Sequence, residues 1–187
     1  MSLFKSYTSE NAPDSSKPLI EESIKTYGFL PNLHAVLAES PAAYEAYART
    51  FEIFEKRSSL SPLEQQVVFM TANYENNCHY CVPGHTMLMT MQNMPQDIIE
   101  GLRKGTVLSD KKLEALRTYT RQLIEKRGHL DTQEIEELLN AGFTRQQALD
   151  VLVGLSSKLI SNFTNAIAQT EVDEPVKAFA WTHPSER

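Results

Sequence analysis

The sequence predicts an all-α protein: a single domain of roughly seven or eight helices with no sheet. Apolar residues recur at three- and four-residue steps along most of the chain, as on one face of a helix. No segment alternates apolar and polar residues as a half-buried strand does. The 187 residues include only 7 glycines, too few for a loop-rich β protein.

Helix boundaries are marked clearly. A capping side chain stands before a helical run at four places, two of them followed by proline at the first helical position. These predicted starts are Ser40-Pro41, Ser61-Pro62 with Glu64, Asp131 with Glu134, and Thr144 with Gln147. The last three also match the capping box. Predicted helix stops are Gly105, Gly128 and Gly142.

Between these marks the apolar residues form helical stripes. One stripe consists of Leu113, Leu116, Thr120, Leu123 and Ile124, and a longer one of Ala148, Leu152, Leu155, Leu159, Phe163 and Ala166. A third contains Tyr44, Tyr47, Phe51 and Phe54, which we interpret as core or oligomer interface. We expect residues 1–17 to be an N-terminal arm, 18–175 the helical domain and 176–187 a C-terminal tail.

Composition excludes several classes of function. The formal net charge is −6 and no run of Lys and Arg is present, so we expect no nucleic-acid partner. No apolar stretch approaches the ~20 residues that span a bilayer, so no membrane association is expected. Residues 1–17 lack the layout of a signal peptide, which favours a cytoplasmic location.

The chemistry is concentrated in the segment ENNCHYCVPGH, which holds both cysteines of the chain. Cys78, Cys81 and His85 are separated by three and four residues, so on a helix they share one face. A proline is tolerated only in the first turn of a helix. Pro83 therefore predicts a helix that starts around Cys78 to Tyr80.

A thiol at a helix start ionises more easily, because the backbone N–H groups there favour negative charge. A thiol with a pKa of ~8.5 is only a few per cent thiolate at neutral pH, whereas one with a pKa of ~6 is about 90% thiolate. The thiolate is the nucleophile, and His85 could shuttle its proton. The pattern favours a redox-active dithiol that needs no cofactor.

Two other interpretations of the motif remain open. Cys78, Cys81, His85 and His79 could hold a metal, although closed zinc sites usually take ligands from two separate segments and no second Cys/His pair exists. The cysteines could also be inert and buried, but we favour the dithiol and expect no metal. A thioredoxin-like host needs β-strands around CxxC and does not fit helical flanks.

A helical chain in which CxxCxxxH opens a central helix resembles the AhpD-type alkylhydroperoxidases of the carboxymuconolactone decarboxylase superfamily. Residues 60–89, LSPLEQQVVFMTANYENNCHYCVPGHTMLM, look like the helix–motif–helix core of that family. YGFLPNLHAVLAESPAAYEAY, residues 27–47, is similar to its lead-in, and ISNFTNAIAQTEVD, residues 160–173, to its final core helix. Residues 94–143 match only in helical character.

The resemblance implies a homo-oligomeric peroxidase that protects against oxidants by reducing organic hydroperoxides through a Cys78–Cys81 disulfide cycle. It makes Cys81 the residue that attacks the peroxide, Cys78 the resolving thiol and His85 part of a proton relay. The implied reductant is a dithiol, carried by a lipoyl-bearing protein or supplied through a peroxiredoxin partner. Decarboxylases of the superfamily lack the cysteine pair, so that activity is the weaker alternative.

The chain departs from the family pattern at the relay. The family has a glutamate twelve residues before the first cysteine, where this chain has Gln66, which cannot exchange a proton. Glu64 lies about 200° around the helix from that position and is needed for the capping box, so it either acts in the site or only caps. A second departure, Pro83-Gly84, could loosen the first turn of the helix.

The remaining candidates have structural interpretations as well as functional ones. His79 and Tyr80 could donate hydrogen bonds to a substrate, but we favour packing for Tyr80. His34, His129 and His183 are expected on the surface or satisfied in the core. Some methionines of the set Met87, Met89, Met91 and Met94 should line the pocket while others fill the core or a subunit contact. The alternative function for the whole chain is a non-catalytic helical oligomer that senses redox state or binds a ligand.

Overall fold

The computed structural model describes residues 3–186, which form nine α-helices and three short 3₁₀-helices and contain no strand. The α-helices are α1 Lys17–Tyr27, α2 Asn32–Leu37, α3 Pro41–Arg57, α4 Pro62–Glu75, α5 Cys81–Met91, α6 Gln96–Lys104, α7 Lys111–Glu125, α8 Thr132–Asn140 and α9 Arg145–Ala168. The 3₁₀-helices are η1 Asp14–Ser16, η2 Glu174–Phe179 and η3 Pro184–Glu186. The all-α prediction is confirmed.

The predicted helix N-caps are present in the structure. Side chains of Ser61, Asp131 and Thr144 accept hydrogen bonds from the backbone three residues on and complete capping boxes at the starts of α4, α8 and α9. Ser40 caps α3 in the simpler way. The chain leaves α6, α7 and α8 through the three predicted glycines, all of which have positive φ.

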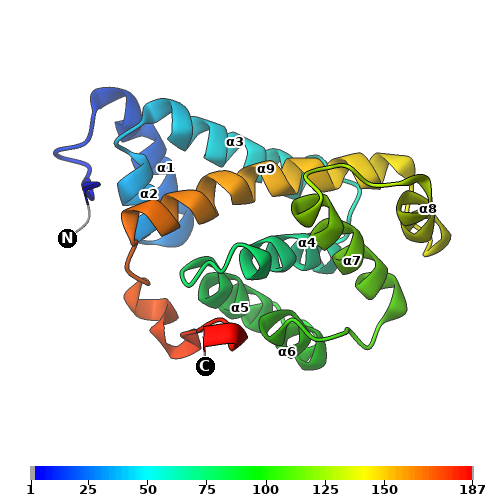
Figure 1. The fold of residues 1–187 in the computed structure, drawn as a ribbon. Helices are drawn as coiled ribbons and strands as arrows, with labels where there is room; N and C mark the ends of the chain where they lie inside the picture. Colours follow the sequence, from blue (N-terminus) through cyan, green and yellow to red (C-terminus); the bar gives the residue numbers. More distant parts are fainter. Residues whose placement is uncertain (1–2, 187) are drawn as a thin grey trace.

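The longest helix, α9, organises the molecule (Figure 1). It packs against α2, α3 and α4, while α4 also packs against α5, α6 and α7. In Figure 1, α3 lies along the upper side of α9, and α4 to α6 lie below it. The motif helix α5 is therefore held between α4, α6 and the C-terminal η2.

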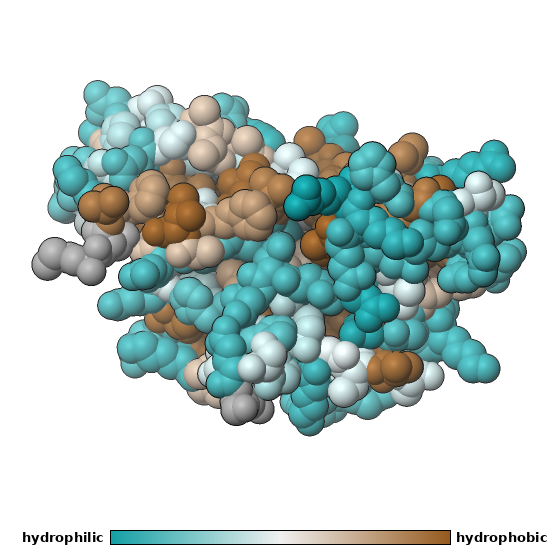
Figure 2. Space-filling view, in the orientation of Figure 1, coloured by the Kyte–Doolittle hydropathy of each residue, from teal (hydrophilic) through white to brown (hydrophobic). Residues whose placement is uncertain are grey.

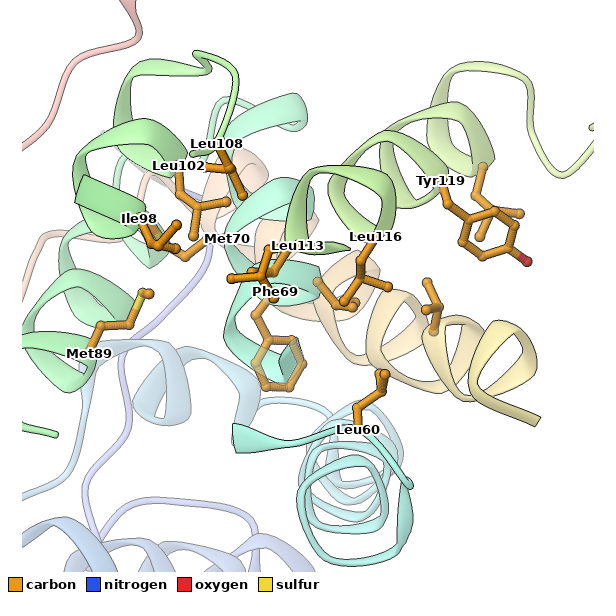
Figure 3. Packing of buried hydrophobic residues seen from close by; sticks show 14 of the residues in the cluster. Leu60, Phe69, Met70, Met89, Ile98, Leu102, Leu108, Leu113, Leu116 and Tyr119 are labelled. Carbon is orange, nitrogen blue, oxygen red and sulfur yellow. The ribbon is translucent and has the colours of Figure 1, made fainter. Parts of the chain in front are cut away.

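Two hydrophobic clusters fill the interior. The larger one takes residues from α3 through α9 and the C-terminal segment, and includes Phe69, Met70, Met89 and Leu116, which are labelled in Figure 3. The smaller one lies between α1, α2, α3 and the motif and includes both cysteines. The cysteines are thus part of a packed core and not of a surface loop.

Most of the apolar stripe predicted on α9 faces away from that core, although Ala148 is buried in the larger cluster and Leu155 packs against it. Leu152, Leu159 and Phe163 are 46%, 54% and 52% exposed, and Leu149 and Ile167 are more exposed still. The buried face of α9 carries small and polar side chains instead. Figure 2 shows apolar surface where Figure 1 draws α9.

The segments at either end of the helical domain lie against it. Ala12 and Ser16 are buried in the segment that we expected to be an arm, and Val176 and Trp181 are buried in the expected tail. The backbone N–H of Tyr7 donates to the carbonyl of Ala35. Residues 1, 2 and 187 of the expected arm and tail lie outside the described part. No helix within residues 3–186 is long and apolar enough to cross a membrane.

Candidate active site

The motif begins in the turn between α4 and α5. Asn77 takes a left-handed conformation (φ 48°), and the N–H of Cys78 donates to the carbonyl of Asn73 at 2.9 Å. α5 starts at Cys81, with Tyr80 at the N-cap position, so Pro83 lies in the first turn as predicted. Cys78 stands just before the helix and Cys81 opens it.

The two cysteines are free thiols with different electrostatic environments. The backbone N–H of Cys81 donates to the Sγ of Cys78 at 3.3 Å. A hydrogen bond from Cys78, and then the positive charge of Lys158, lower the pKa of Cys81 to about 6, against the opposing effect of burial. The same hydrogen bond, together with burial, raises the pKa of Cys78. Cys81 is therefore the thiol that ionises first.

Side chains of α9 surround the sulfur atoms. The amide Nδ2 of Asn165 donates to the Sγ of Cys81 at 3.3 Å and lies 3.7 Å from that of Cys78. The Sγ of Cys81 also lies 4.0 Å from the hydroxyl oxygen of Ser161. These polar groups are suited to hold a thiolate in a buried site, because a buried charge needs hydrogen-bond partners.

His85 lies one turn after Cys81 and is buried. Its Nδ1 donates to the Oε1 of Gln66 at 2.7 Å, and its Nε2 accepts from the Nζ of Lys158 at 2.6 Å. Burial and then the neighbouring lysine hold the pKa of His85 well below its usual range, so the imidazole is neutral. Gln66 occupies the predicted place beside the histidine, with an amide in place of a carboxylate.

Lys158 is a site residue that sequence reasoning missed. Its side chain enters from α9, is 1% exposed, and places Nζ 4.5 Å from the ring centre of Phe69 and 5.6 Å from that of Phe51. These are cation–π distances. The signal was a polar face, Lys158, Ser161, Asn162 and Asn165, running along an otherwise apolar helix.

A second set of polar contacts fixes the turn before the motif. Asn162 donates through Nδ2 to Oδ1 of Asn73 at 2.9 Å and accepts through Oδ1 from Asn76 at 3.0 Å. These bonds join the end of α4 to α9. The position of the cysteines relative to Lys158 is set in this way.

His79 and Tyr80 face the C-terminal segment. The Oη of Tyr80 donates to Asp173 and accepts from the backbone N–H of Leu33 at 3.3 Å. His79 bonds through Nε2 with the carbonyl oxygen of Thr170 at 2.9 Å. Both side chains anchor the motif turn, and Tyr80 packs in the smaller cluster while it also lines the cavity beside Cys81.

Glu64 is not part of the site. One carboxylate oxygen accepts from the backbone N–H of Ser61 at 2.8 Å, and the other pairs with Lys112 at 2.7 Å. The helix turns this side chain away from Gln66, as an offset of two residues requires. Of the two interpretations of Glu64, capping is correct and a role beside the cysteines is wrong.

A cavity of about 340 Å³ opens onto Cys81, His85 and Lys158. Its other walls are mainly apolar and include Phe29, Leu33, Phe51, Met87, Leu88 and Met91. Met89, by contrast, is buried in the larger cluster and Met94 packs against it, so the methionines divide as predicted. A volume of this size admits a small organic molecule.

The other histidines do not join the cysteine cluster. His34 is buried and bonds through Nδ1 with the hydroxyls of Ser23 and Tyr44, at 2.8 and 3.1 Å. His129 is exposed and His183 is partly buried. Within residues 3–186, no three His, Cys, Asp or Glu side chains are grouped so that they could hold a metal ion.

Comparison with protein-family models and with curated proteins gives no match. Solved structures do match over nearly their whole length. An AhpD-core, peroxidase-related protein from Ralstonia eutropha JMP134 superposes with a TM-score of 0.81 at 19% identity, covering 92% of this chain and 93% of its own. A peroxidase-related protein from Silicibacter sp. TM1040 gives 0.73 at 18% identity, covering 89% and 88%.

The debrominase Bmp8, solved with 2,3,4-tribromopyrrole, has the same architecture. Its TM-score is 0.78 at 15% identity, and 96% of each chain is covered. Matches of this length and quality establish the common fold. The chain therefore has the AhpD-like all-α fold that its cysteine motif predicts.

Proposed function

We propose that the protein is a thiol-dependent peroxidase that reduces organic hydroperoxides through a cycle between the Cys78–Cys81 dithiol and its disulfide. The observation that carries the proposal is the asymmetry of the two thiols. Cys81 has a lowered pKa of about 6 and lines the cavity, while Cys78 has a raised pKa and is not among the residues that line it. One nucleophile and one resolving thiol are what this cycle needs.

In this cycle the Cys81 thiolate attacks the outer oxygen of the hydroperoxide, giving a sulfenic acid and an alcohol. Cys78 then attacks the Cys81 sulfur, so that water leaves and the disulfide forms. His85, neutral and hydrogen-bonded on both ring nitrogens, belongs to the proton relay. An external dithiol, from a lipoyl-bearing protein or a peroxiredoxin partner, restores the thiols.

The apolar cavity supports an organic substrate over hydrogen peroxide. Its walls of aromatic, leucine and methionine side chains would bury an alkyl or aryl group beside the thiolate. We further propose that the protein works in the cytoplasm, where dithiol reductants keep such thiols reduced.

The test is steady-state turnover of tert-butyl hydroperoxide with excess dihydrolipoamide. We expect turnover in the unmodified protein and none in Cys81→Ser, because serine is not ionised at neutral pH. Undiminished turnover in that variant would remove the mechanism. Absence of turnover in the unmodified protein would favour the non-catalytic redox sensor instead.

A second candidate activity is the reductive removal of halogen from a small aromatic ring. It is favoured by the aromatic lining of the cavity and by the common fold with a debrominase. In such a reaction the two thiols supply two electrons and one proton, releasing bromide and the reduced ring. Bromide release from 2,3,4-tribromopyrrole under the same conditions separates this activity from the first.

A further inference from the structure

The proposed cycle needs an acid that the expected relay does not supply. When the thiolate takes the outer oxygen of a hydroperoxide, the remaining oxygen leaves as an alkoxide, a strong base that must be protonated. Gln66 has no exchangeable acid proton at neutral pH. His85 holds its one N–H toward Gln66 and presents a lone pair at Nε2. Neither Gln66 nor His85 can therefore supply the proton that the alkoxide needs.

Lys158 lies where the missing proton is needed. It lines the same cavity as Cys81, and its Nζ donates to His85 over 2.6 Å. The rings of Phe69 and Phe51 flank Nζ at 4.5 and 5.6 Å. No described Asp or Glu forms an ion pair with it. The neutral imidazole thus fixes the direction of the ammonium without taking its charge.

The groups that act electrostatically on Lys158 are few. Burial lowers the pKa of the ammonium, and the cysteines of the motif, followed by Glu55 of α3, oppose that change. His85 of α5 is neutral. The reduced site thus favours a Lys158 ammonium beside a Cys81 thiolate, a pair that holds as many protons as a neutral amine and a neutral thiol.

We propose that Lys158 is the general acid of this site, protonating the alkoxide that leaves when Cys81 is oxidised. The proposal rests on the proposed peroxidase function and assigns it a catalytic residue. Lys158 thereby takes the place that a glutamate at position 66 would occupy in the relay, but from the opposite side of the histidine.

Atoms and charges balance in this scheme. The Cys81 thiolate, the hydroperoxide and the Lys158 ammonium give the sulfenic acid, the alcohol and a neutral amine. The amine then accepts the proton of the Cys78 thiol and returns it to the hydroxide that leaves as the disulfide forms, giving water. The external dithiol supplies two electrons and two protons, which restore the Cys78 thiol, the Cys81 thiolate and the Lys158 ammonium.

Two variants of Lys158 separate its charge from its acidity. Lys158→Arg keeps a positive charge, but a guanidinium does not give up its proton near neutral pH. Lys158→Met keeps the apolar stem and removes both properties. Lys104→Met is the matched control, because Lys104 is an exposed lysine on α6 paired with Glu100.

Two oxidants make the assay specific for proton donation. tert-Butyl hydroperoxide releases an alkoxide that needs an acid, whereas peracetic acid releases acetate, which does not. In single-turnover oxidation of Cys81, we expect Lys158→Arg to lose ~10²-fold or more with tert-butyl hydroperoxide. The same variant should stay within severalfold of the unmodified protein with peracetic acid. Lys158→Met should be slow with both oxidants, and Lys104→Met should match the unmodified protein.

Alkylation of Cys81 by iodoacetamide provides a readout without a peroxide. It should be nearly normal in Lys158→Arg and slowed in Lys158→Met, where the thiolate loses its cation. Equal losses on the two oxidants in Lys158→Arg, or no loss on either, would overturn the role as acid while leaving the peroxidase function intact. An unmodified protein that tert-butyl hydroperoxide does not oxidise would overturn both.

Discussion

At the scale of single residues, the site depends on a difference in pKa between two cysteine thiols. Cys78 and Cys81 exchange one hydrogen bond whose effects on the two pKa values are opposite. The Cys78 thiol therefore lowers the pKa of Cys81, in addition to being its partner in the disulfide. Replacing Cys78 should change the reactivity of Cys81 before any disulfide chemistry begins.

We predict that Cys78→Ser and Cys78→Ala differ in this respect. Serine keeps an O–H that can donate to the Cys81 sulfur, so the midpoint of Cys81 alkylation should stay near pH 6. Alanine removes the donor, so the midpoint should rise; a midpoint near pH 7 would halve the thiolate present at that pH. The measurement is the pH dependence of iodoacetamide alkylation. Identical profiles for the two variants would show that the hydrogen bond is unimportant.

The sequence predicted the site residues of the cysteine motif better than those that α9 contributes. Spacing predicted that Cys81 and His85 share one face of a helix, and the family resemblance, not the spacing, pointed to Gln66, which lies beside the histidine. It could not predict Lys158, because contacts between segments 73 residues apart depend on how α5 and α9 pack. A lysine on a long helix is usually exposed, so only its grouping with Ser161 and Asn165 marked it.

At the scale of elements, helix boundaries were the most predictable feature because their signals are local. Each capping box is a reciprocal pair of hydrogen bonds within four residues. The short α2 and the exposed apolar side of α9 were not predicted. Periodicity shows that a stripe shares one face, but it does not tell whether that face meets the core, a partner or solvent.

The centre of α9 contains a close approach that gives an element-scale prediction. A Cβ placed on Gly154 would lie 2.9 Å from the ring of Phe54 and 3.0 Å from the Cγ1 of Val68, both fully buried. Gly154→Ala should therefore destabilise the fold by about 1–3 kcal/mol through overpacking, although alanine favours a helix.

Gly84 offers the matched comparison for that substitution. It lies within α5, has no atom within 4 Å of an added Cβ, and does not require a positive φ. Gly84→Ala should leave stability unchanged or raise it by about 0.5–1 kcal/mol. Urea denaturation of the two variants provides the measurement. A Gly154→Ala protein as stable as the parent would contradict the close packing of α9 on α3 and α4.

At the scale of the whole molecule, the exposed stripe on α9 supports the homo-oligomer that we expect from the family resemblance. Leu149, Leu152, Leu159, Phe163 and Ile167 all lie on this one helix and are 46–66% exposed. Several large apolar side chains on one face are typical of a surface that is covered in the assembled protein.

We predict that Leu159→Glu combined with Phe163→Glu lowers the molecular mass in solution, measured by light scattering after size-exclusion chromatography. The substituted positions face outward, so the helical content measured by circular dichroism should persist. Ala46→Glu, at an exposed position of α3, is the control. An unchanged mass in the double variant would place the assembly surface elsewhere.

The all-α architecture was predictable as a whole because every level of the sequence agrees: caps, stops, periodicity and the scarcity of glycine. What the pattern could not supply was the polar lining between α9 and the motif. Those side chains contact the motif only after the helices have packed, so the polar face of α9 marked them as a group but did not show what they would contact.

The attachment of the motif turn to late segments of the chain has a consequence for biosynthesis. Cys78 and Cys81 are synthesised about 80 residues before Lys158. The interval between Tyr80 and its hydrogen-bond partner Asp173 is longer still. At about 5–20 residues per second, the interval before Lys158 is about 4–16 s. During this interval the thiols lack Lys158 and Asn165, and we expect Cys81 to react more slowly than in the folded protein. We therefore expect Cys81 to reach its full reactivity only when α9 docks and supplies Lys158 and Asn165.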